Sequence, residues 1–155
     1  MGIDIDPLSP TPLYQQSRGA IVRGIGHGEL HRGDTLASVR SLAGAFGINP
    51  ATVAKAYGQL RSEGLLESNA KSGSFITRDN TSDVPERAYV EEWRERLTTL
   101  LAEGVANGLS ADVVLQNCRT ITASMAGGGH TAAIDAADTL TGRQTGATNH
   151  KGASS

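Results

Sequence analysis

The sequence predicts a mostly α-helical protein with one small β-hairpin. Between residues 13 and 64, apolar side chains recur every three or four positions in three short segments, which is the spacing of one helical face. Two short β-prone runs follow, and beyond them two longer stretches again place apolar residues at helical spacing. We therefore expect three helices, a hairpin and a helical C-terminal part, in that order.

The chain has 155 residues, of which 38% are hydrophobic and 4% aromatic, so any core is modest and mainly aliphatic. A net charge of -2 argues against a protein that binds nucleic acid through bulk positive charge alone. The charge is unevenly distributed. Residues 1–78 carry 8 Lys and Arg against 6 Asp and Glu, whereas residues 79–126 carry 4 against 8. This division favours a nucleic-acid module joined to an acidic second part.

The first element along the chain is a short arm. Residues 1–11 alternate apolar and acidic side chains before two prolines, so we expect an extended segment. A helix follows within residues 12–30, where Tyr14, Ile21 and Ile25 share one face. Gly19, Gly24 and Gly26 each cost roughly 1 kcal/mol relative to alanine, so packing must hold this helix together.

The next two helices carry local start and stop signals. Ser38 is a suitable N-cap for the second helix, and Gly47 provides a left-handed stop. Asn49 caps the third helix, Pro50 fits its first turn, and Gly64 lies just past its end. The runs "LLES" and "SFIT", joined by "NAKSG", then predict the hairpin. This order is the layout of a winged helix-turn-helix, whose third helix enters the DNA major groove.

The first turn of the third helix has a composition that allows close approach to another molecule. This turn carries small and polar side chains before the apolar anchors begin. Ala51 permits close approach, and Thr52 offers a hydroxyl to a base or phosphate and a methyl to thymine. Lys55, one turn below Ala51, could reach a phosphate or a guanine edge. The inner face presents Val53, Ala56 and Leu60.

Two further basic residues fit this interpretation. Arg40 lies in the first turn of the preceding helix, and Lys71 lies at the hairpin tip, where Gly73 allows the turn. Each basic residue also fits a solvated surface charge, and Thr52 fits an ordinary first-turn position. The residues predicted to bind DNA are Arg40, Asn49, Pro50, Ala51, Thr52, Lys55, Lys71 and Gly73.

Residues 79–126 predict two amphipathic helices, the second capped by Ser110. Their apolar faces either fold back on the winged helix or pair with a second copy of the chain, and we favour the dimer. Cys118 fits a small buried apolar residue better than a redox switch. From residue 127 the composition turns to Gly, Ala, Thr and Ser, which predicts a disordered tail. The predicted dimer contacts are Val90, Trp93, Leu97, Leu100, Leu101, Val114, Cys118 and Ile121.

These motifs together resemble a known family. "PLYQQ", "GELHRGDTLASVRSLAGAFGINPATVAKAYGQLRSEGLLES" and "SGSFI" are similar to the winged-helix domain of GntR-family bacterial transcription regulators, over residues 12–77. The Asn-Pro-x-Thr-Val opening and "GLSADVVL" are similar to the YtrA-like subgroup. The resemblance implies a homodimeric repressor or activator on a palindromic operator, and we favour the repressor. It also implies that Arg40, in the Ser-Val-Arg motif, and residues 49–52 contact DNA.

The chain departs from the family pattern at several positions that bear on stability and base preference. Ala37 replaces a common proline, Ser41 replaces the glutamate of a capping box, and Ser17 replaces an apolar residue. Ala51 and Lys71 stand where a polar residue and a glycine are frequent.

The sequence shows no nucleophile–base pair, metal-ligand cluster or phosphate loop, so we expect no enzyme, no cofactor and no metal site. His27 and His31 bracket a turn without a third ligand. No segment is apolar enough for a membrane and no signal peptide is present, which predicts a cytoplasmic protein. About 45 residues of paired helix are too few to enclose a small-molecule pocket easily. The sequence does not identify a small-molecule effector. The alternative function is a non-catalytic protein-interaction module, which predicts no salt-dependent binding to a palindromic site.

Overall fold

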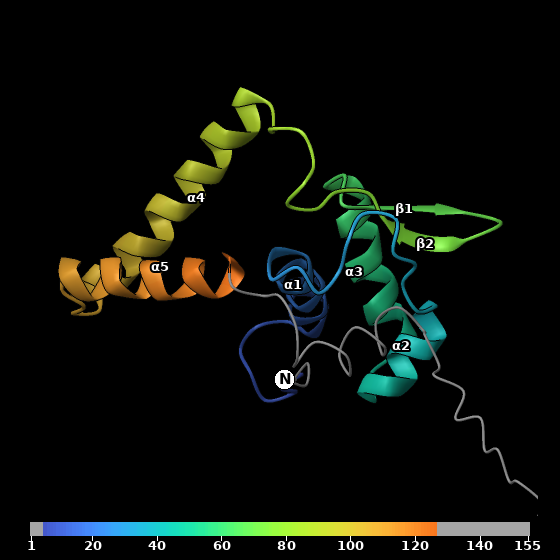
Figure 1. Cartoon of the computed structure of the whole chain (residues 1–155). Coiled ribbons are helices and arrows are strands. Elements are labelled where there is room, and N and C mark those ends of the chain that lie inside the picture. Colours follow the sequence, from blue (N-terminus) through green and yellow to red (C-terminus); the bar gives the residue numbers. More distant parts are fainter. Residues whose placement is uncertain (1–4, 127–155) are drawn as a thin grey trace, which may run out of the picture.

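The computed structural model describes residues 5–126, so the predicted tail at 127–155 lies outside the described part. The chain forms five helices and one hairpin within these residues, and the predicted mostly helical fold is confirmed. The helix pair α4–α5 and the hairpin extend on opposite sides of a three-helix body (Figure 1). The elements in order are α1 (Leu13–Gly26), α2 (Val39–Phe46), α3 (Pro50–Ser62), β1 (Leu66–Asn69), β2 (Gly73–Ile76), α4 (Arg87–Ala106) and α5 (Ala111–Ala126).

The segment before α1 makes turns and bends, so the predicted extended arm is wrong for residues 5–11. The physical reason is the side-chain amide of Gln16. Its oxygen accepts a hydrogen bond from the backbone N–H of Asp6 at 2.9 Å. Its nitrogen donates to the carbonyls of Asp6 and Thr11 at 2.9 and 2.8 Å. One glutamine therefore folds the segment back onto the first turn of α1.

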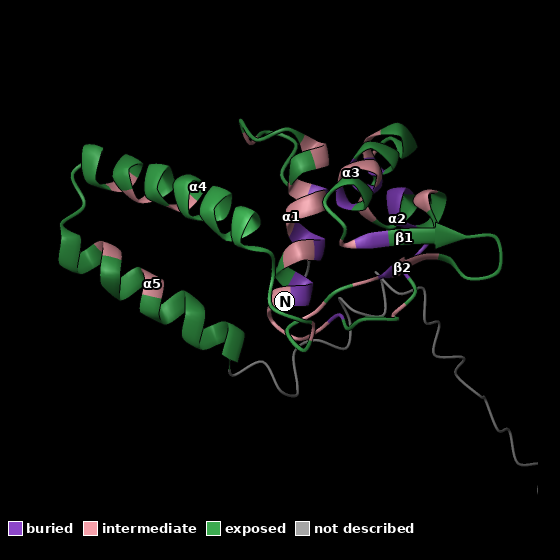
Figure 2. Cartoon of the chain, turned by 90° about the horizontal axis from the view of Figure 1, so that it is seen from above, coloured by how far each residue is buried: buried purple, intermediate pink, exposed green. Residues whose placement is uncertain are grey.

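The hydrophobic core lies between the first three helices and the hairpin, and Figure 2 shows no buried residue in α4 or α5. The apolar faces predicted from helical spacing are confirmed for α2 and α3. Ser17 is also buried, and its hydroxyl donates to the carbonyl of Leu13 at 2.9 Å, which satisfies it inside the helix. The largest core side chains are Ile21, Leu30, Leu42, Val53, Tyr57, Leu60, Leu66 and Ile76.

Helix α2 begins and ends as predicted. The hydroxyl oxygen of Ser38 accepts from the backbone N–H of Ser41 at 3.1 Å, and the Ser38 hydroxyl donates to the Ser41 hydroxyl at 2.9 Å. Gly47 adopts a left-handed conformation with φ of 65°. A serine pair thus forms the N-terminal cap in the absence of the family's glutamate.

A buried tyrosine ties α3 to the start of α2. The hydroxyl of Tyr57 donates to the carbonyl of Ala37 at 2.6 Å, and the side chain is 1% exposed. Burial raises the pKa of Tyr57, so the hydroxyl stays protonated and able to donate at neutral pH. Because Ala37 immediately precedes the N-cap of α2, this bond links the two helices of the helix-turn-helix.

The hairpin is held on both edges. Strands β1 and β2 are antiparallel, from the Leu66–Ile76 pair to the Asn69–Gly73 pair. On the other edge of β2, residues 33–36 add backbone bonds. These run from the N–H of Leu36 to the carbonyl of Ser74 at 2.8 Å, from Ile76 to Asp34 at 2.9 Å, and from Gly33 to Ile76 at 2.8 Å.

Asp79 fastens the chain that leaves the hairpin. Its carboxylate accepts from the Thr81 hydroxyl at 2.6 Å, from the Thr81 N–H at 2.8 Å, and from the N–H of Arg32 at 2.8 Å. These hydrogen bonds, led by that of the Thr81 hydroxyl, lower the pKa of Asp79 to about 2. An ionised carboxylate therefore connects the segment leading to α4 with the turn at residues 31–34.

The two C-terminal helices form a separate pair. The helical part is predicted from residue 79, but α4 itself starts only at Arg87. The predicted cap of α5 is confirmed, because the hydroxyl oxygen of Ser110 accepts from the N–H of Val113 at 3.3 Å. Within residues 5–126, no helix has both the length and the apolar character needed to cross a bilayer.

We expect Tyr57→Phe to lower the free energy of unfolding by about 1–3 kcal/mol, measured by urea denaturation. The physical reason is that the carbonyl of Ala37 accepts from no other donor within residues 5–126 and would stay without one. Ser62→Ala is the control, since it removes an exposed hydroxyl bonded to the Gln59 carbonyl and should cost less than about 0.5 kcal/mol. A Tyr57→Phe protein as stable as the wild type would show that this bond does not hold α2 and α3 together.

Candidate nucleic-acid interface

The first turn of α3 is built by its cap. Asn49 is extended, with φ of -65° and ψ of 133°, and its side-chain oxygen accepts from the N–H of Ala51 at 2.8 Å. Pro50 occupies the first helical position, where no N–H is needed. The side chains of Asn49, Pro50 and Ala51 are exposed and Thr52 is half-buried. The turn is therefore accessible to a partner without loss of its own hydrogen bonds.

Packing fixes which side of α3 faces outward. Val53, Ala56, Tyr57 and Leu60 are at most 1% exposed and form the inner face. A rotation of α3 about its axis would pull these side chains from the core, so the exposed side is set by hydrophobic burial. That side carries Ala51 and Lys55, with Thr52 at its edge.

Two predicted DNA-binding residues on neighbouring elements keep their charges uncompensated. Arg40 is exposed in the first turn of α2, which packs against α3. Lys71 is exposed in the loop of the hairpin. Neither side chain makes a hydrogen bond or ion pair within residues 5–126, and nor does the hydroxyl of Thr52. All three remain available to an outside partner.

The loop of the hairpin is shaped by a residue that the sequence analysis did not single out. The side-chain oxygen of Asn69 accepts from the N–H groups of Lys71 and Ser72 at 3.0 and 2.6 Å. Gly73 has a φ of 68°, in the left-handed region that favours glycine, as the predicted turn requires. Asparagine bonding to the backbone two residues on is a known turn signal, so "NAKSG" contained this information.

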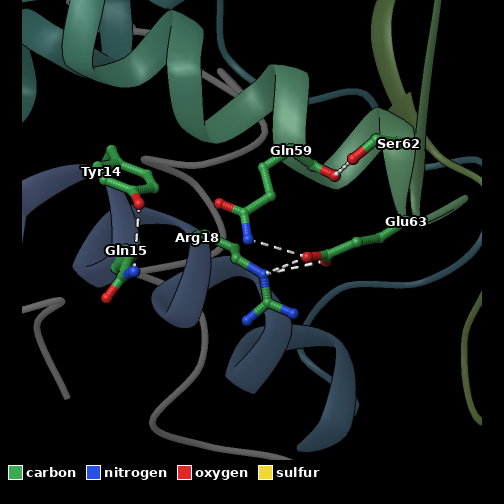
Figure 3. A network of polar contacts seen from close by, with 6 residues as sticks. All are labelled: Tyr14, Gln15, Arg18, Gln59, Ser62 and Glu63. Carbon is green, nitrogen blue, oxygen red and sulfur yellow. Dashed lines mark hydrogen bonds and ion pairs between the residues drawn. The ribbon is translucent and has the colours of Figure 1, made fainter. Parts of the chain in front are cut away.

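Lys55 does not extend freely from α3. Its ammonium nitrogen lies 3.9 Å from the centroid of the Tyr14 ring, on α1. One turn further along α1, Arg18 Nε donates to both oxygens of Glu63, just past the end of α3, at 2.8 and 2.9 Å. Gln59 donates to the same carboxylate at 3.1 Å (Figure 3). The sequence analysis missed both contacts because they join two helices whose packing it could not specify.

The residues predicted to form a dimer contact lie on α4 and α5. Val90, Trp93, Leu100 and Ile121 are 42–62% exposed. Leu97, Leu101, Val114 and Cys118 are half-buried. Within residues 5–126, the only polar contact between these helices and the winged helix joins His27 Nε2 to the Ser124 hydroxyl at 3.3 Å.

A cleft of about 670 Å³ lies between the winged helix and α4, lined in part by Arg18, Leu65, Arg78, Tyr89 and Arg96. The cleft is not enclosed by α4 and α5. It lies where α4 meets the winged helix. Residues 5–126 contain no group of three His, Cys, Asp or Glu side chains placed to hold a metal ion.

Comparison with known proteins agrees with this geometry. A family model described as bacterial regulatory proteins of the gntR family matches residues 13–76, which run from α1 to β2. The HTH-type transcriptional repressor YtrA of Bacillus subtilis is 32% identical over 130 residues, covering 81% of this chain and 96% of the relative. That alignment is about twice as long as the family match, so the similarity extends beyond the winged helix.

Solved structures show the same fold. YtrA from Sulfolobus acidocaldarius, a GntR-family transcription factor, is 35% identical with a TM-score of 0.53, covering 68% of this chain and 99% of that one. A protein described as a transcriptional antiterminator from Listeria monocytogenes EGD-e is 25% identical with a TM-score of 0.72, covering 83% of this chain and 95% of that one.

We expect Asn49→Ala to lower the free energy of unfolding by about 1 kcal/mol, since the N–H of Ala51 loses its capping acceptor. Urea denaturation measures the loss. Asn49→Ser should restore most of it, because serine caps helices about as well as asparagine. Equal losses in both variants would contradict a capping role for Asn49.

Proposed function

The chain belongs to the GntR family of bacterial regulatory proteins and is a DNA-binding transcription regulator, and from this premise we propose that it is a homodimeric repressor of a palindromic operator. The observation that carries the proposal is the exposed first turn of α3, flanked by Arg40 and Lys71, whose side chains make no hydrogen bond or ion pair with residues 5–126. The name of the Bacillus subtilis relative, a transcriptional repressor, supports repression over activation.

The proposed DNA contacts follow from position and chemistry. The first turn of α3, residues 49–52, enters the major groove, where the Thr52 hydroxyl and methyl meet base edges. Arg40 and Lys71 meet backbone phosphates on either side and fix the register of the helix. Gly73 gives the hairpin loop the turn that carries Lys71. Residues 12–78 form the DNA-binding unit, preceded by the arm at 1–11.

Residues 79–126 form the proposed dimerisation unit. In a single chain, Trp93 is 48% exposed, Leu100 is 62% exposed and Ile121 is 54% exposed. A pair of helices that buries none of its own residues is marginal without further packing. A second copy of the chain would cover this stripe through a two-fold interface.

A dimer would also compensate for the weak DNA binding expected from the few basic residues of one winged helix. A few phosphate contacts per subunit give weak, salt-sensitive binding, and joining two subunits multiplies their effect. Two-fold symmetry then matches half-sites about one helical turn of DNA apart. Acting on chromosomal DNA, such a regulator works in the bacterial cytoplasm.

The DNA proposal predicts protection of a symmetric site immediately upstream of the protein's own gene. Arg40→Ala should weaken binding to all DNA and reduce the salt slope by about 1 per subunit, because one phosphate contact is lost. Thr52→Ala should lose more affinity for the operator than for unrelated DNA. Footprinting and fluorescence titrations between 50 and 200 mM salt measure both.

Arg119→Ala is the matched control, since it removes an equal charge from the exposed side of α5 and should bind like the wild type. If no site is protected at low salt, or if Arg40→Ala and Thr52→Ala bind as well as the wild type, α3 does not read DNA. The search for function would then move to protein partners of the winged helix.

The dimer proposal predicts that Trp93→Glu converts the chain from dimer to monomer, because the charge would be buried in an apolar interface. Sedimentation equilibrium at several protein concentrations measures the mass. Thr99→Glu places the same charge on the opposite side of α4 and should remain dimeric. A wild-type chain that sediments as a monomer, or a Trp93→Glu chain that stays dimeric, would contradict this interface.

A further inference from the structure

We propose that Tyr14 is a positioning residue for DNA binding, whose ring holds the ammonium of Lys55 against a backbone phosphate. The inference rests on the proposed function of α3. The two side chains come from different helices, and the ammonium nitrogen lies 3.9 Å from the ring centroid. Lys55 is nevertheless exposed, so its ammonium keeps a side open to an outside partner.

The charges along the seam between α1 and α3 differ from turn to turn. Arg18 is paired with the carboxylate of Glu63 through two hydrogen bonds, so its charge is compensated within the protein (Figure 3). Among the described residues, the ammonium of Lys55 contacts a neutral aromatic ring and no carboxylate. A carboxylate in place of the ring would cancel the charge of Lys55, whereas the ring orients the ammonium and leaves its full charge for DNA.

The contact with the ring reduces the conformational entropy that the Lys55 side chain loses on binding DNA. A free lysine side chain has four rotatable bonds, and a contact to DNA must immobilise them. The contact with Tyr14 restricts the side chain before DNA arrives. An ammonium has three N–H donors, so one side can face the ring while the others reach phosphate oxygens.

The position of Lys55 favours phosphate over a base. It lies one turn after Ala51 on the exposed side of α3, turned toward α1. A side chain held at the flank of a helix in the major groove faces the strand that borders the groove, whereas the groove floor is reached from the first turn. The contact should therefore be independent of sequence.

A double-mutant cycle on the full chain tests the proposal. The probes are DNA from immediately upstream of the gene and an unrelated duplex of the same length. Lys55→Gln should reduce the salt slope by about 1 per subunit. Tyr14→Leu should weaken binding about two- to fivefold per subunit on both duplexes, while Tyr14→Phe, which keeps the ring, stays within about twofold of the wild type. In the Lys55→Gln background, Tyr14→Leu should have no further effect.

Arg18→Gln separates positioning from folding. It breaks the ion pair at the same seam, so it should lower the unfolding temperature, yet it removes a compensated charge and should leave the salt slope unchanged. All affinities are measured at a temperature where every variant is folded. A purely structural role for Tyr14 would weaken binding equally with and without Lys55, and that outcome overturns the inference.

Three other results also decide the matter. If Tyr14→Phe loses as much affinity as Tyr14→Leu, the hydroxyl acts and the ring does not, which overturns the proposal. If the wild type binds the upstream DNA and Tyr14→Leu binds equally well, the inference fails while the proposed function stands. If the wild type binds neither duplex, the proposed function itself fails.

Discussion

The hydrogen bond from the Tyr57 hydroxyl to the Ala37 carbonyl is the constraint on which the proposed DNA-binding surface depends. It joins the middle of α3 to the residue that leads into α2, inside a core where neither group has an alternative partner among residues 5–126. Arg40 follows Ala37 by three residues, and the first turn of α3 precedes Tyr57 by about two turns. One buried polar contact therefore relates two exposed segments whose side chains share no hydrogen bond or ion pair among residues 5–126.

The chain divides into two parts that differ in how far their apolar side chains are buried. From α1 to β2, hydrophobic burial fixes every element, and the polar side chains that lie inside are satisfied. In α4 and α5 no residue is buried, and large apolar side chains face outward. The first part can hold a rigid surface by itself. The second part exposes large apolar side chains on two neighbouring helices, which is typical of a surface that contacts another protein surface.

The sequence predicted what is encoded locally. Caps such as Ser38, Asn49 and Ser110, the stop at Gly47 and the inner faces of α2 and α3 follow from neighbouring residues and helical spacing, and the structure agrees. Contacts between distant segments were not predictable in this way. The Arg18–Glu63 and Tyr14–Lys55 pairs require the packing of α1 on α3, and the pairing of residues 33–36 with β2 requires the hairpin's placement. The turn at residues 5–11 was missed for the same reason, because it depends on hydrogen bonds between the Gln16 side chain and the backbone of Asp6, ten residues earlier.

The hydrogen bonds that Asp79 accepts have a consequence for the junction between the winged helix and α4. Because its pKa is about 2, this carboxylate stays charged throughout the pH range in which cells live. Acidification of the cell interior therefore cannot loosen the junction by protonating it. The hydrogen bonds from the main chain of Arg32 and from Thr81 therefore keep a charged acceptor at this junction at every pH that a cell maintains.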